Sequence, residues 1–329
     1  MNLSACIGIF FLFLAQPKLN LFSISGEAQG TTYHISYYAT DSLVSRVAVE
    51  QLFREIDSSL SIYKNYSRIS RFNQSEKGIL MDKHLAKVVQ ASLDIYRETA
   101  GISDITVYPL VNAWGFGPVK PIAAPDSATI HHILPCIGAS KLHISQNWLL
   151  KDLPCVQIDL NGIAQGYTVD LLADLLEAKK IRNYLVEVGG EIRVKGRKYP
   201  SGEKMKLGIE APSNEDLQQT VIHKIIQPSE GAITTSGNYR KFHMSGGKRV
   251  SHLIDPVSGY PFSNELISVT IYARKALIAD GYDNALMGMG LKKGLQFMEQ
   301  HRNMEAYFIF RKADGTIGDT ATRGFYKLF

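Results

Sequence analysis

The hydrophobic positions of the chain recur with two different periods, and these periods predict both helices and strands. Apolar side chains follow helical spacing over 47–60, 84–100 and 278–287. Residues 31–38 are rich in β-branched and aromatic side chains, which is typical of a β-strand. No internal repeat and no low-complexity linker divides the sequence. The pattern therefore predicts one continuous α+β domain.

The clearest local unit in the pattern lies within residues 155–190. It predicts a strand over 155–160, a glycine-containing turn over 161–166, a helix over 168–180 and a strand over 184–188. Such units are normally parallel and right-handed, and their turn faces a ligand crevice. Because the helix N-terminus presents free backbone N–H groups, the unit favours a phosphate at that point.

The first 25 residues differ in composition from the rest. An apolar run over 7–15 precedes Pro17, and it is far shorter than the roughly 20 residues that span a bilayer. We therefore expect residues 1–25 to be an export leader and residues 26–329 to form the folded domain. Residues 3–6 match a bacterial lipobox, but the apolar run follows Cys6 instead of preceding it, so lipid attachment is an open alternative.

Charge and cysteine content narrow the possible partners. The 36 basic and 31 acidic residues leave a net charge of +5 and are scattered along the chain, which argues against nucleic acid as the main partner. The three cysteines, Cys6, Cys136 and Cys155, have no CxxC spacing, so neither a zinc site nor a disulfide framework is predicted. We expect Cys136 and Cys155 to be buried as small apolar residues.

The sequence lacks the common phosphate-binding and hydrolase motifs. Its candidate functional residues are polar clusters at the ends of apolar elements. The sequence has no P-loop, Rossmann fingerprint, GxSxG or HExxH motif. On the helix predicted over 278–287, Asp280 and Asn284 lie one turn apart, so their oxygens converge on one point. Mg²⁺ takes such oxygen ligands, and Asp283 is a third candidate. The alternative is that Asp280 is a helix N-cap and the others are solvated.

Three other polar segments each allow two interpretations. Residues 251–259 place His252 before an Asp-Pro and a Ser-Gly turn, as in a loop after a strand, although a lone histidine is more often structural. Residues 234–240 offer hydroxyls and Arg240, which suit a phosphate or a surface turn. Residues 104–117 indicate an apolar strand, but a buried core segment followed by a turn would explain them equally well.

In this order, the polar clusters closely resemble motifs of the ApbE family of FAD:protein FMN transferases. The resemblance covers the chain from about residue 26 to the C-terminus and rests on residues 29–33, 61–64 with 70–73, 104–118, 159–167, 188–190, 235–240, 251–256 and 279–283. It implies a single ApbE-like α+β domain with mixed sheets flanked by helices and an FAD crevice.

The resemblance also implies an activity. Such enzymes transfer FMN from FAD to a threonine hydroxyl of another exported protein, with Mg²⁺ on the pyrophosphate and AMP as the second product. Their acceptors carry a Ser-Gly-Ala-Thr-like motif and belong to membrane redox complexes, which places the enzyme on the periplasmic side of the bacterial inner membrane. This chain has no Ser-Gly-Ala-Thr segment, so self-modification at that motif is not expected.

The family's metal ligands fall on matching positions. The resemblance assigns Mg²⁺ to the side chains of Asp280 and Asn284 and to the backbone carbonyl of Gly162, with Asp283 in support. Position 284 is usually threonine in the family, and the amide oxygen of Asn284 remains a neutral donor. We take His252 as the candidate base because the unperturbed histidine pKa lies near neutrality.

The FAD pocket falls on other matching positions. Arg240 is expected to steady the phosphates, Tyr63 to lie along the flavin, and FAD to fill a crevice between residues 159–166 and the segment at Asp104. Gln165 replaces a lysine or glutamate of many relatives. The resemblance implies that the pocket draws on Gln29, Tyr63, Ile102, Ser103, Asp104, Asp159, Gln165 and Ile254.

Two other functions remain open at this point. A metal-dependent FAD pyrophosphatase would use the same site to pass FMN to water, because acceptor and water compete for one phosphorus. A flavin-binding lipoprotein would hold FAD without turning it over.

Overall fold

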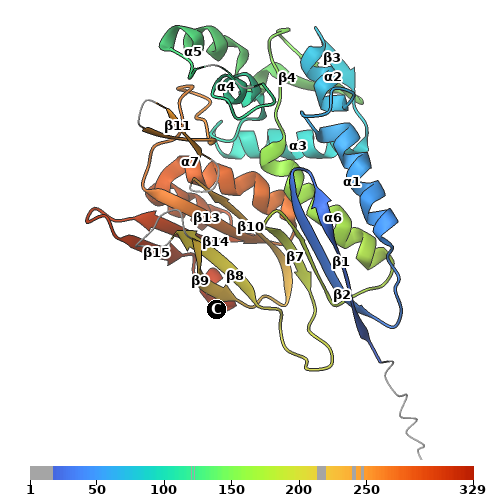
Figure 1. Cartoon of the computed structure of the whole chain (residues 1–329). Helices are drawn as coiled ribbons and strands as arrows, with labels where there is room; N and C mark the ends of the chain where they lie inside the picture. Colours follow the sequence, from blue (N-terminus) through green and yellow to red (C-terminus); the bar gives the residue numbers. More distant parts are fainter. Residues whose placement is uncertain (1–17, 120, 122, 213–219, 239–241, 246–247) are drawn as a thin grey trace, which may run out of the picture.

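An eight-stranded sheet forms the centre of the molecule (Figure 1). The computed structural model describes residues 18–119, 121, 123–212, 220–238, 242–245 and 248–329. Every neighbouring pair of strands in the sheet is antiparallel. The strand predicted over 31–38 is confirmed as β2. In spatial order the strands are β1 (Asn20–Ala28), β2 (Thr31–Ala39), β6 (Tyr184–Val188), β7 (Glu191–Lys195), β10 (Glu230–Gly237), β13 (Leu266–Ala273), β14 (Met304–Arg311) and β15 (Ile317–Ala321).

Helices cover one face of this sheet. α6 (Asn161–Ala178) and α7 (Ala276–Gln300) pack on each other and on the strands, while α1 (Arg46–Leu60) and α3 (Lys83–Glu98) pack against them from outside (Figure 1). Fully buried apolar side chains from helices and sheet fill the space between, as in the cluster that holds Leu286 and Phe308. The α+β class and the helices predicted over 47–60, 84–100 and 278–287 are therefore confirmed.

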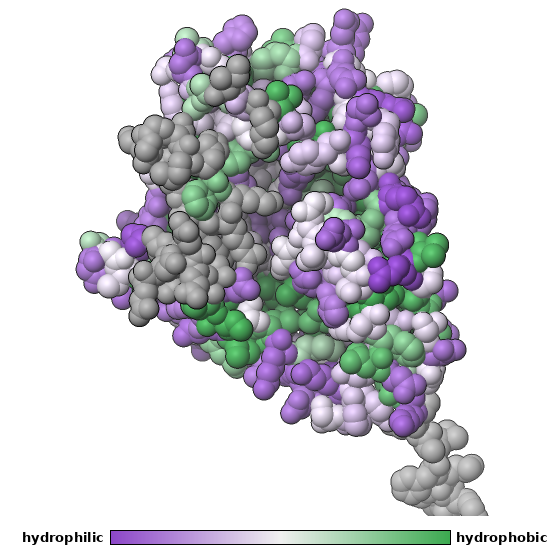
Figure 2. All heavy atoms as spheres, viewed as in Figure 1, coloured by the Kyte–Doolittle hydropathy of each residue, from purple (hydrophilic) through white to green (hydrophobic). Residues whose placement is uncertain are grey.

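The opposite face of the sheet carries smaller elements. The hairpin of β8 (Leu207–Pro212) and β9 (Thr220–Ile226) and the C-terminal turn η4 (Phe325–Leu328) pack there around the buried ring of Tyr307. Figure 2 shows apolar side chains gathering over this hairpin, where Ile222 is 65% exposed, whereas the surface of α1 is largely hydrophilic.

A group of short elements lies beyond the N-terminal end of α6, at the top of Figure 1. Some of them form a three-stranded sheet in the order β3-β5-β4 and a hairpin of β11 and β12. The elements are α2 (Arg68–Gln74), β3 (Gly78–Leu80), η1 (Ile105–Val107), α4 (Tyr108–Ala113), α5 (Ser127–Ile133), η2 (Leu134–Cys136), η3 (Ala139–Lys141), β4 (Leu142–Ser145), β5 (Trp148–Lys151), β11 (Phe242–Ser245) and β12 (Lys248–Ser251).

The strand–turn–helix–strand unit predicted within 155–190 is wrong in its first half. Residues 156–160 are in no strand, and their peptide groups bond to side chains such as Asn73 instead of a neighbouring strand. The turn expected over 161–166 is already the first part of α6. β6 is confirmed as a strand, but both its neighbours are antiparallel, so no parallel crossover forms.

The strand predicted over 104–117 is also wrong, because this segment is helical. Its first turn, η1, is capped by Asp104, whose side chain accepts a hydrogen bond from Thr106 N. Pro109 then occupies a first-turn position of α4, where its missing N–H costs nothing. The Asp104 cap and Pro109 therefore favour a helix here, although the run of apolar residues suggested a strand.

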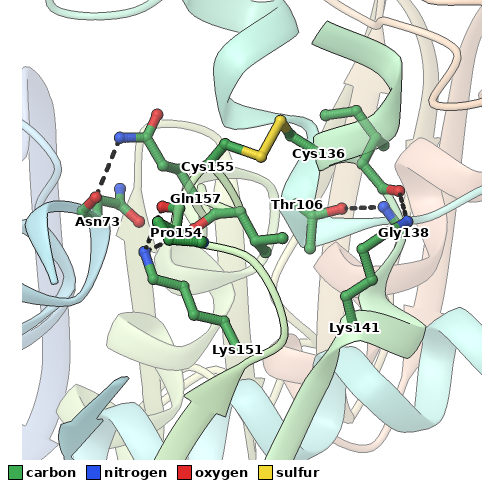
Figure 3. The surroundings of a disulfide bond; sticks show 11 residues. Asn73, Thr106, Cys136, Gly138, Lys141, Lys151, Pro154, Cys155 and Gln157 are labelled. Carbon is green, nitrogen blue, oxygen red and sulfur yellow. Dashed lines mark hydrogen bonds between the residues drawn. A yellow bond between two sulfur atoms is a disulfide. The ribbon is translucent and has the colours of Figure 1, made fainter. Parts of the chain in front are cut away.

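The two cysteines expected to be buried thiols form a disulfide instead. Cys136 and Cys155 are joined with a Cα–Cα distance of 5.5 Å, and Cys155 is exposed (Figure 3). A spacing rule for CxxC pairs does not detect this bond, because the partners are 19 residues apart and only the fold brings η2 against the segment before α6.

The predicted boundary at residue 25 divides a strand. β1 begins at Asn20 and pairs with β2 along its whole length, and Ile24 is part of the core. Residues 20–25 therefore belong to the folded domain, which corrects the expected domain start at residue 26. Residues 1–17, with Cys6, lie outside the described part of the chain. No helix within the described residues is long and apolar enough to cross a membrane.

Candidate functional site

A cavity of about 710 Å³ opens between the main sheet's helices and the group of short elements beyond α6. The N-terminus of α6, the first turns of α7 and the end of β10 line it from one side. The loop after α1 and the turn after β12 complete its walls. Of the residues predicted for the site, the structure brings the following together in this lining: Gln29, Tyr63, Ile102, Ser103, Asp104, Asp159, Gly162, Gln165, His252, Ile254, Asp280, Asp283 and Asn284. Arg240 lies outside the described residues.

One corner of the cavity holds the three positions assigned to a cation. Asn284 Nδ2 lies 3.3 Å from the carbonyl oxygen of Gly162, and Asn284 Oδ1 accepts a 2.6 Å hydrogen bond from Ser236 Oγ. One turn earlier on α7, Asp280 Oδ2 accepts a 2.7 Å bond from the backbone N–H of Gly166. Two helices therefore present a carboxylate, an amide and a carbonyl to the same wall.

The close approach of α6 and α7 depends on glycine. A Cβ on Gly166 would lie 2.3 Å from Ala276 O and 2.6 Å from Asp280 Cβ, and a Cβ on Gly162 would lie 2.8 Å from Asn284 Nδ2. Any larger residue at position 166 would push the helices apart. The glycines of the predicted turn therefore act as helix–helix spacers.

The N-cap interpretation of Asp280 is wrong. α7 begins at Ala276, so Asp280 lies in its second turn and is only 4% exposed. The first backbone N–H groups of α7 are capped from another helix, because Asp170 on α6 accepts 3.0 Å bonds from both Ala276 N and Leu277 N. Asp280 thus lines the cavity and is not solvated.

Asp283 lies behind this corner and is almost completely buried. Burial, followed by the negative charges of Asp280 and Glu191, raises the pKa of Asp283 well above its usual value, and the Thr234 hydroxyl opposes this. The Oδ1 atom of Asp283 has no hydrogen-bond partner. The negative charge of Asp280 beside this buried carboxyl and its unsatisfied oxygen makes the corner electrostatically suited to a divalent cation.

The donor set is that of a hard cation. Mg²⁺ accepts carboxylate, carbonyl and amide oxygens and commonly needs only one or two carboxylates besides substrate phosphates. Within the described residues, no three His, Cys, Asp or Glu side chains form a metal cluster. Rotation of the Asn284 amide by half a turn would bring Oδ1 toward Gly162 O and let Nδ2 donate to Ser236 Oγ. The residues present therefore fit Mg²⁺.

Other parts of the cavity lining carry the polar groups that were predicted to bind a flavin nucleotide. Asp159 Oδ1 accepts a 2.8 Å bond from the N–H of Asn161 at the start of α6, and Tyr63, which is 58% exposed, stands at the mouth. Burial, followed by the charge of Asp159, raises the pKa of Tyr63. Gln165 donates from Nε2 to Val188 O at 2.9 Å, and Gln29 donates to Thr168 Oγ1 at 3.1 Å. These bonds hold both amides against the cavity.

Asp104 has a largely structural set of bonds. Its Oδ1 accepts from Thr106 N at 2.7 Å and from Thr106 Oγ1 at 2.6 Å, and its Oδ2 accepts from Ala139 N at 3.0 Å. Burial raises the pKa of Asp104, and the hydrogen bonds from Thr106 oppose the rise. Asp104 therefore shapes the wall on which Ser103 and Ile102 lie.

The candidate base His252 follows β12 directly, as expected for a loop after a strand. It lines the cavity, and its ring meets the edge of Phe116 at a centroid distance of 6.2 Å. Motif reasoning missed Asp57, which lines the cavity near Gln29 with its pKa raised by burial. Asp57 has no distinctive spacing in the sequence. Ser236 belongs to the segment 234–240, whose hydroxyls suited a phosphate or a surface turn, and in the structure it bonds to Asn284 in the cavity.

Comparisons with known proteins match this chain over most of its length. The model of the ApbE family matches residues 29–308. The FAD:protein FMN transferase of Vibrio cholerae is 37% identical over 299 residues, which cover 89% of this chain and 88% of the relative. The solved flavin transferase ApbE from Vibrio cholerae has a TM-score of 0.86 at 34% identity, covering 95% of this chain and 100% of that one. The apo form of the flavinyl transferase ApbE of Pseudomonas stutzeri has a TM-score of 0.83 at 34% identity, covering 96% and 98%.

Fold and site together define the class of the protein as a flavin-transferring enzyme. The chain belongs to the ApbE family of FAD:protein FMN transferases. The family resemblance seen in the sequence is thereby confirmed.

Proposed function

We propose that this enzyme transfers FMN from FAD to a threonine hydroxyl of an exported or membrane redox protein, with Mg²⁺ on the pyrophosphate and AMP as the second product. One observation carries the proposal. The corner formed by Asp280, Asn284 and Gly162 lies in the same cavity as Tyr63 and Asp159, so a cation and a flavin nucleotide can be held together.

Asp280, Asn284 and the carbonyl of Gly162 would hold the cation, with Asp283 behind them. When bound, Mg²⁺ would neutralise the pyrophosphate and stabilise the leaving oxygen of AMP. The Gly166 N–H holds one oxygen of Asp280 at the edge of the cavity. Ser236 fixes the Asn284 amide. The chain thus holds the Asp280 carboxylate in place before substrate binds, whereas the Asn284 amide would rotate by half a turn to present its oxygen to the cation.

His252 would take the proton of the acceptor hydroxyl. As the threonine oxygen bonds to the phosphorus of the FMN half, the bond from that phosphorus to the bridging oxygen breaks, and AMP leaves with this oxygen. An alcohol is a poor nucleophile at neutral pH, so a base within reach of the hydroxyl lowers the barrier. Arg240 is retained as a candidate phosphate ligand.

The cellular location is part of the proposal. The Cys136–Cys155 disulfide supports an oxidising compartment such as the periplasm, because disulfides rarely persist in the cytosol. The apolar run over 7–15 supports export by a leader, with lipid attachment at Cys6 as the alternative. Acceptors with a Ser-Gly-Ala-Thr-like motif in membrane redox complexes would then be within reach.

The test is incubation of the purified protein with FAD, MgCl₂ and a domain that carries a Ser-Gly-Ala-Thr segment, followed by intact mass measurement. We expect the domain to gain one FMN group and AMP to appear in equal amount. Free FMN and AMP without a mass gain would identify a pyrophosphatase instead. Bound FAD without any turnover would identify a flavin-binding protein.

Variants of the corner test the metal assignment in the same assay. Asp280→Asn should lose most transfer activity, and Asn284→Leu should require more Mg²⁺ because it removes one oxygen donor. Asn284→Thr should keep or raise activity, since a hydroxyl oxygen replaces the amide oxygen. Asp174→Asn, which changes an exposed carboxylate paired with Lys275 at 2.9 Å, is the matched control. An unchanged magnesium curve for Asp280→Asn would place the cation elsewhere.

A further inference from the structure

The segment that delivers two site residues to the cavity has an unusual support. Residues 154–160, the strap, connect β5 to α6, and in the described structure they form no β-ladder. The strap contains Asp159 and leads directly into the N-terminus of α6, which contains Gly162. Since no sheet holds it, its position depends on the Cys136–Cys155 disulfide and on individual hydrogen bonds, most of which involve side chains.

Lys151, at the end of β5, makes the first of these bonds. Its side chain is buried, with the residue 7% exposed, and Nζ donates to the carbonyls of Phe72 at 3.2 Å, Pro154 at 3.0 Å and Val156 at 2.9 Å. Nζ also lies 4.9 Å from the centre of the Phe72 ring. Figure 3 shows Lys151 reaching toward Pro154 on one side of the disulfide. No carboxylate in the described part of the chain lies within ion-pair distance of Nζ.

A buried ammonium without a carboxylate partner is costly, so packing alone does not explain it. An ammonium has three donors, and here each finds one carbonyl oxygen. Two of these carbonyls, on Pro154 and Val156, flank Cys155 in the strap. The third, on Phe72, lies in the last turn of α2. The ammonium therefore fixes the start of the strap to α2, which an apolar side chain cannot do. Burial lowers the pKa of Lys151 to about 8, as this environment requires.

The rest of the strap is held in the same way. Asn73 accepts from Ile158 N at 2.7 Å and donates to Ile158 O at 2.9 Å, so one side chain takes the place of a neighbouring strand. Gln157 donates to Asn73 O at 3.1 Å, and Asp159 N donates to Ile105 O at 2.8 Å. The supports run without a gap from Lys151 to Asp159.

We propose that Lys151 is a positioning residue for flavin transfer, which holds the strap so that Asp159 and the Gly162 carbonyl keep their places in the cavity wall. This proposal rests on the proposed roles of those two residues. Lys151 touches neither substrate nor cation. Its loss should weaken FAD binding through Asp159 and raise the KM for FAD more than it lowers kcat.

The experiment compares Lys151→Met with Lys141→Met in the full chain. Lys141 lies on the other side of the same disulfide and donates to Ile137 O at 2.5 Å, so its variant removes a similar ammonium that does not hold the strap (Figure 3). FAD affinity is measured by flavin fluorescence without acceptor, at a temperature at which circular dichroism shows each variant fully folded. We expect about a ten-fold weaker Kd, or about 1.4 kcal/mol, for Lys151→Met and a change below two-fold for Lys141→Met.

If Lys151→Met does not fold, Lys151→Gln carries the test, because it keeps two donors on a shorter stem and should weaken FAD binding several-fold. A folded position-151 variant with the wild-type Kd would overturn the proposal, and so would an equal loss in Lys141→Met. The binding readout separates this result from the proposed function. A wild type that binds FAD but transfers nothing would contradict the function and leave the positioning role measurable.

Discussion

Removal of the Cys136–Cys155 disulfide gives the prediction whose size follows most directly from the structure. The bond joins residues 19 positions apart, and closing a loop of that length in the unfolded chain contributes about 3 kcal/mol in the chain-entropy account. For a chain of this size, each kcal/mol moves the unfolding midpoint by about 2 °C. The double variant Cys136→Ser, Cys155→Ser should therefore unfold about 6 °C below the wild type.

Thermal unfolding followed by circular dichroism, with and without dithiothreitol, measures this effect. The reductant should lower the midpoint of the wild type to that of the double variant and leave the variant unchanged. Because the strap is also held by Lys151 and Asn73, both forms should still fold. Thiol titration verifies reduction. A fully reduced wild type with an unchanged midpoint would refute the reasoning, since the cross-link would then restrict nothing in the unfolded chain.

Three further predictions concern stability. Without divalent cations, Asp280→Asn should unfold at a higher temperature than the wild type, because it removes a charge that faces the buried Asp283; added Mg²⁺ should stabilise only the wild type, and equal stabilisation of both would contradict the assigned site. A chain that starts at Gly26 should be at least about 2 kcal/mol less stable in urea than one that starts at Lys18, because it lacks the buried Ile24 of β1 and its pairing with β2; equal stability would show that β1 is dispensable. Lys151 has a pKa of about 8 in the folded protein against 10.5 for the ordinary side chain, so the unfolded chain binds more protons between these values. The free energy of unfolding of the wild type, relative to Lys151→Met, should therefore rise from pH 8 to pH 10, by at most about 1.4 kcal/mol per pH unit, and a constant difference in urea melts would contradict the lowered pKa.

Elements with a strong local period could be predicted from the sequence because one face of each is buried. α1, α3 and the first part of α7 carry apolar residues at helical spacing, and β2 alternates, so local pattern and burial agree. The pairing of Asp280 and Asn284 on one helix face also follows from helical geometry. The remaining site positions were predicted from the order of the motifs, which indicates the family but gives no distances between residues.

The errors over 155–160 and at β1 share one physical origin, which is support from residues far away in the chain. Residues 156–160 are extended like a strand, but their bonds go to Asn73 and Lys151 instead of a ladder. Residues 20–25 were assigned to the leader, but they belong to β1 because β2 pairs with them.

The sequence by itself determined α1, α3 and the first part of α7, the class of fold, the family and the residue types of the cation corner, because these depend on periodicity and motifs within short stretches. Only the tertiary structure decided that Asp280 is buried in the second turn of α7, that Gly166 lets α6 approach it, and that Cys136 meets Cys155. Such contacts join residues far apart in the chain, 114 positions in the bond from Gly166 to Asp280, and no local pattern encodes a distance between two helices.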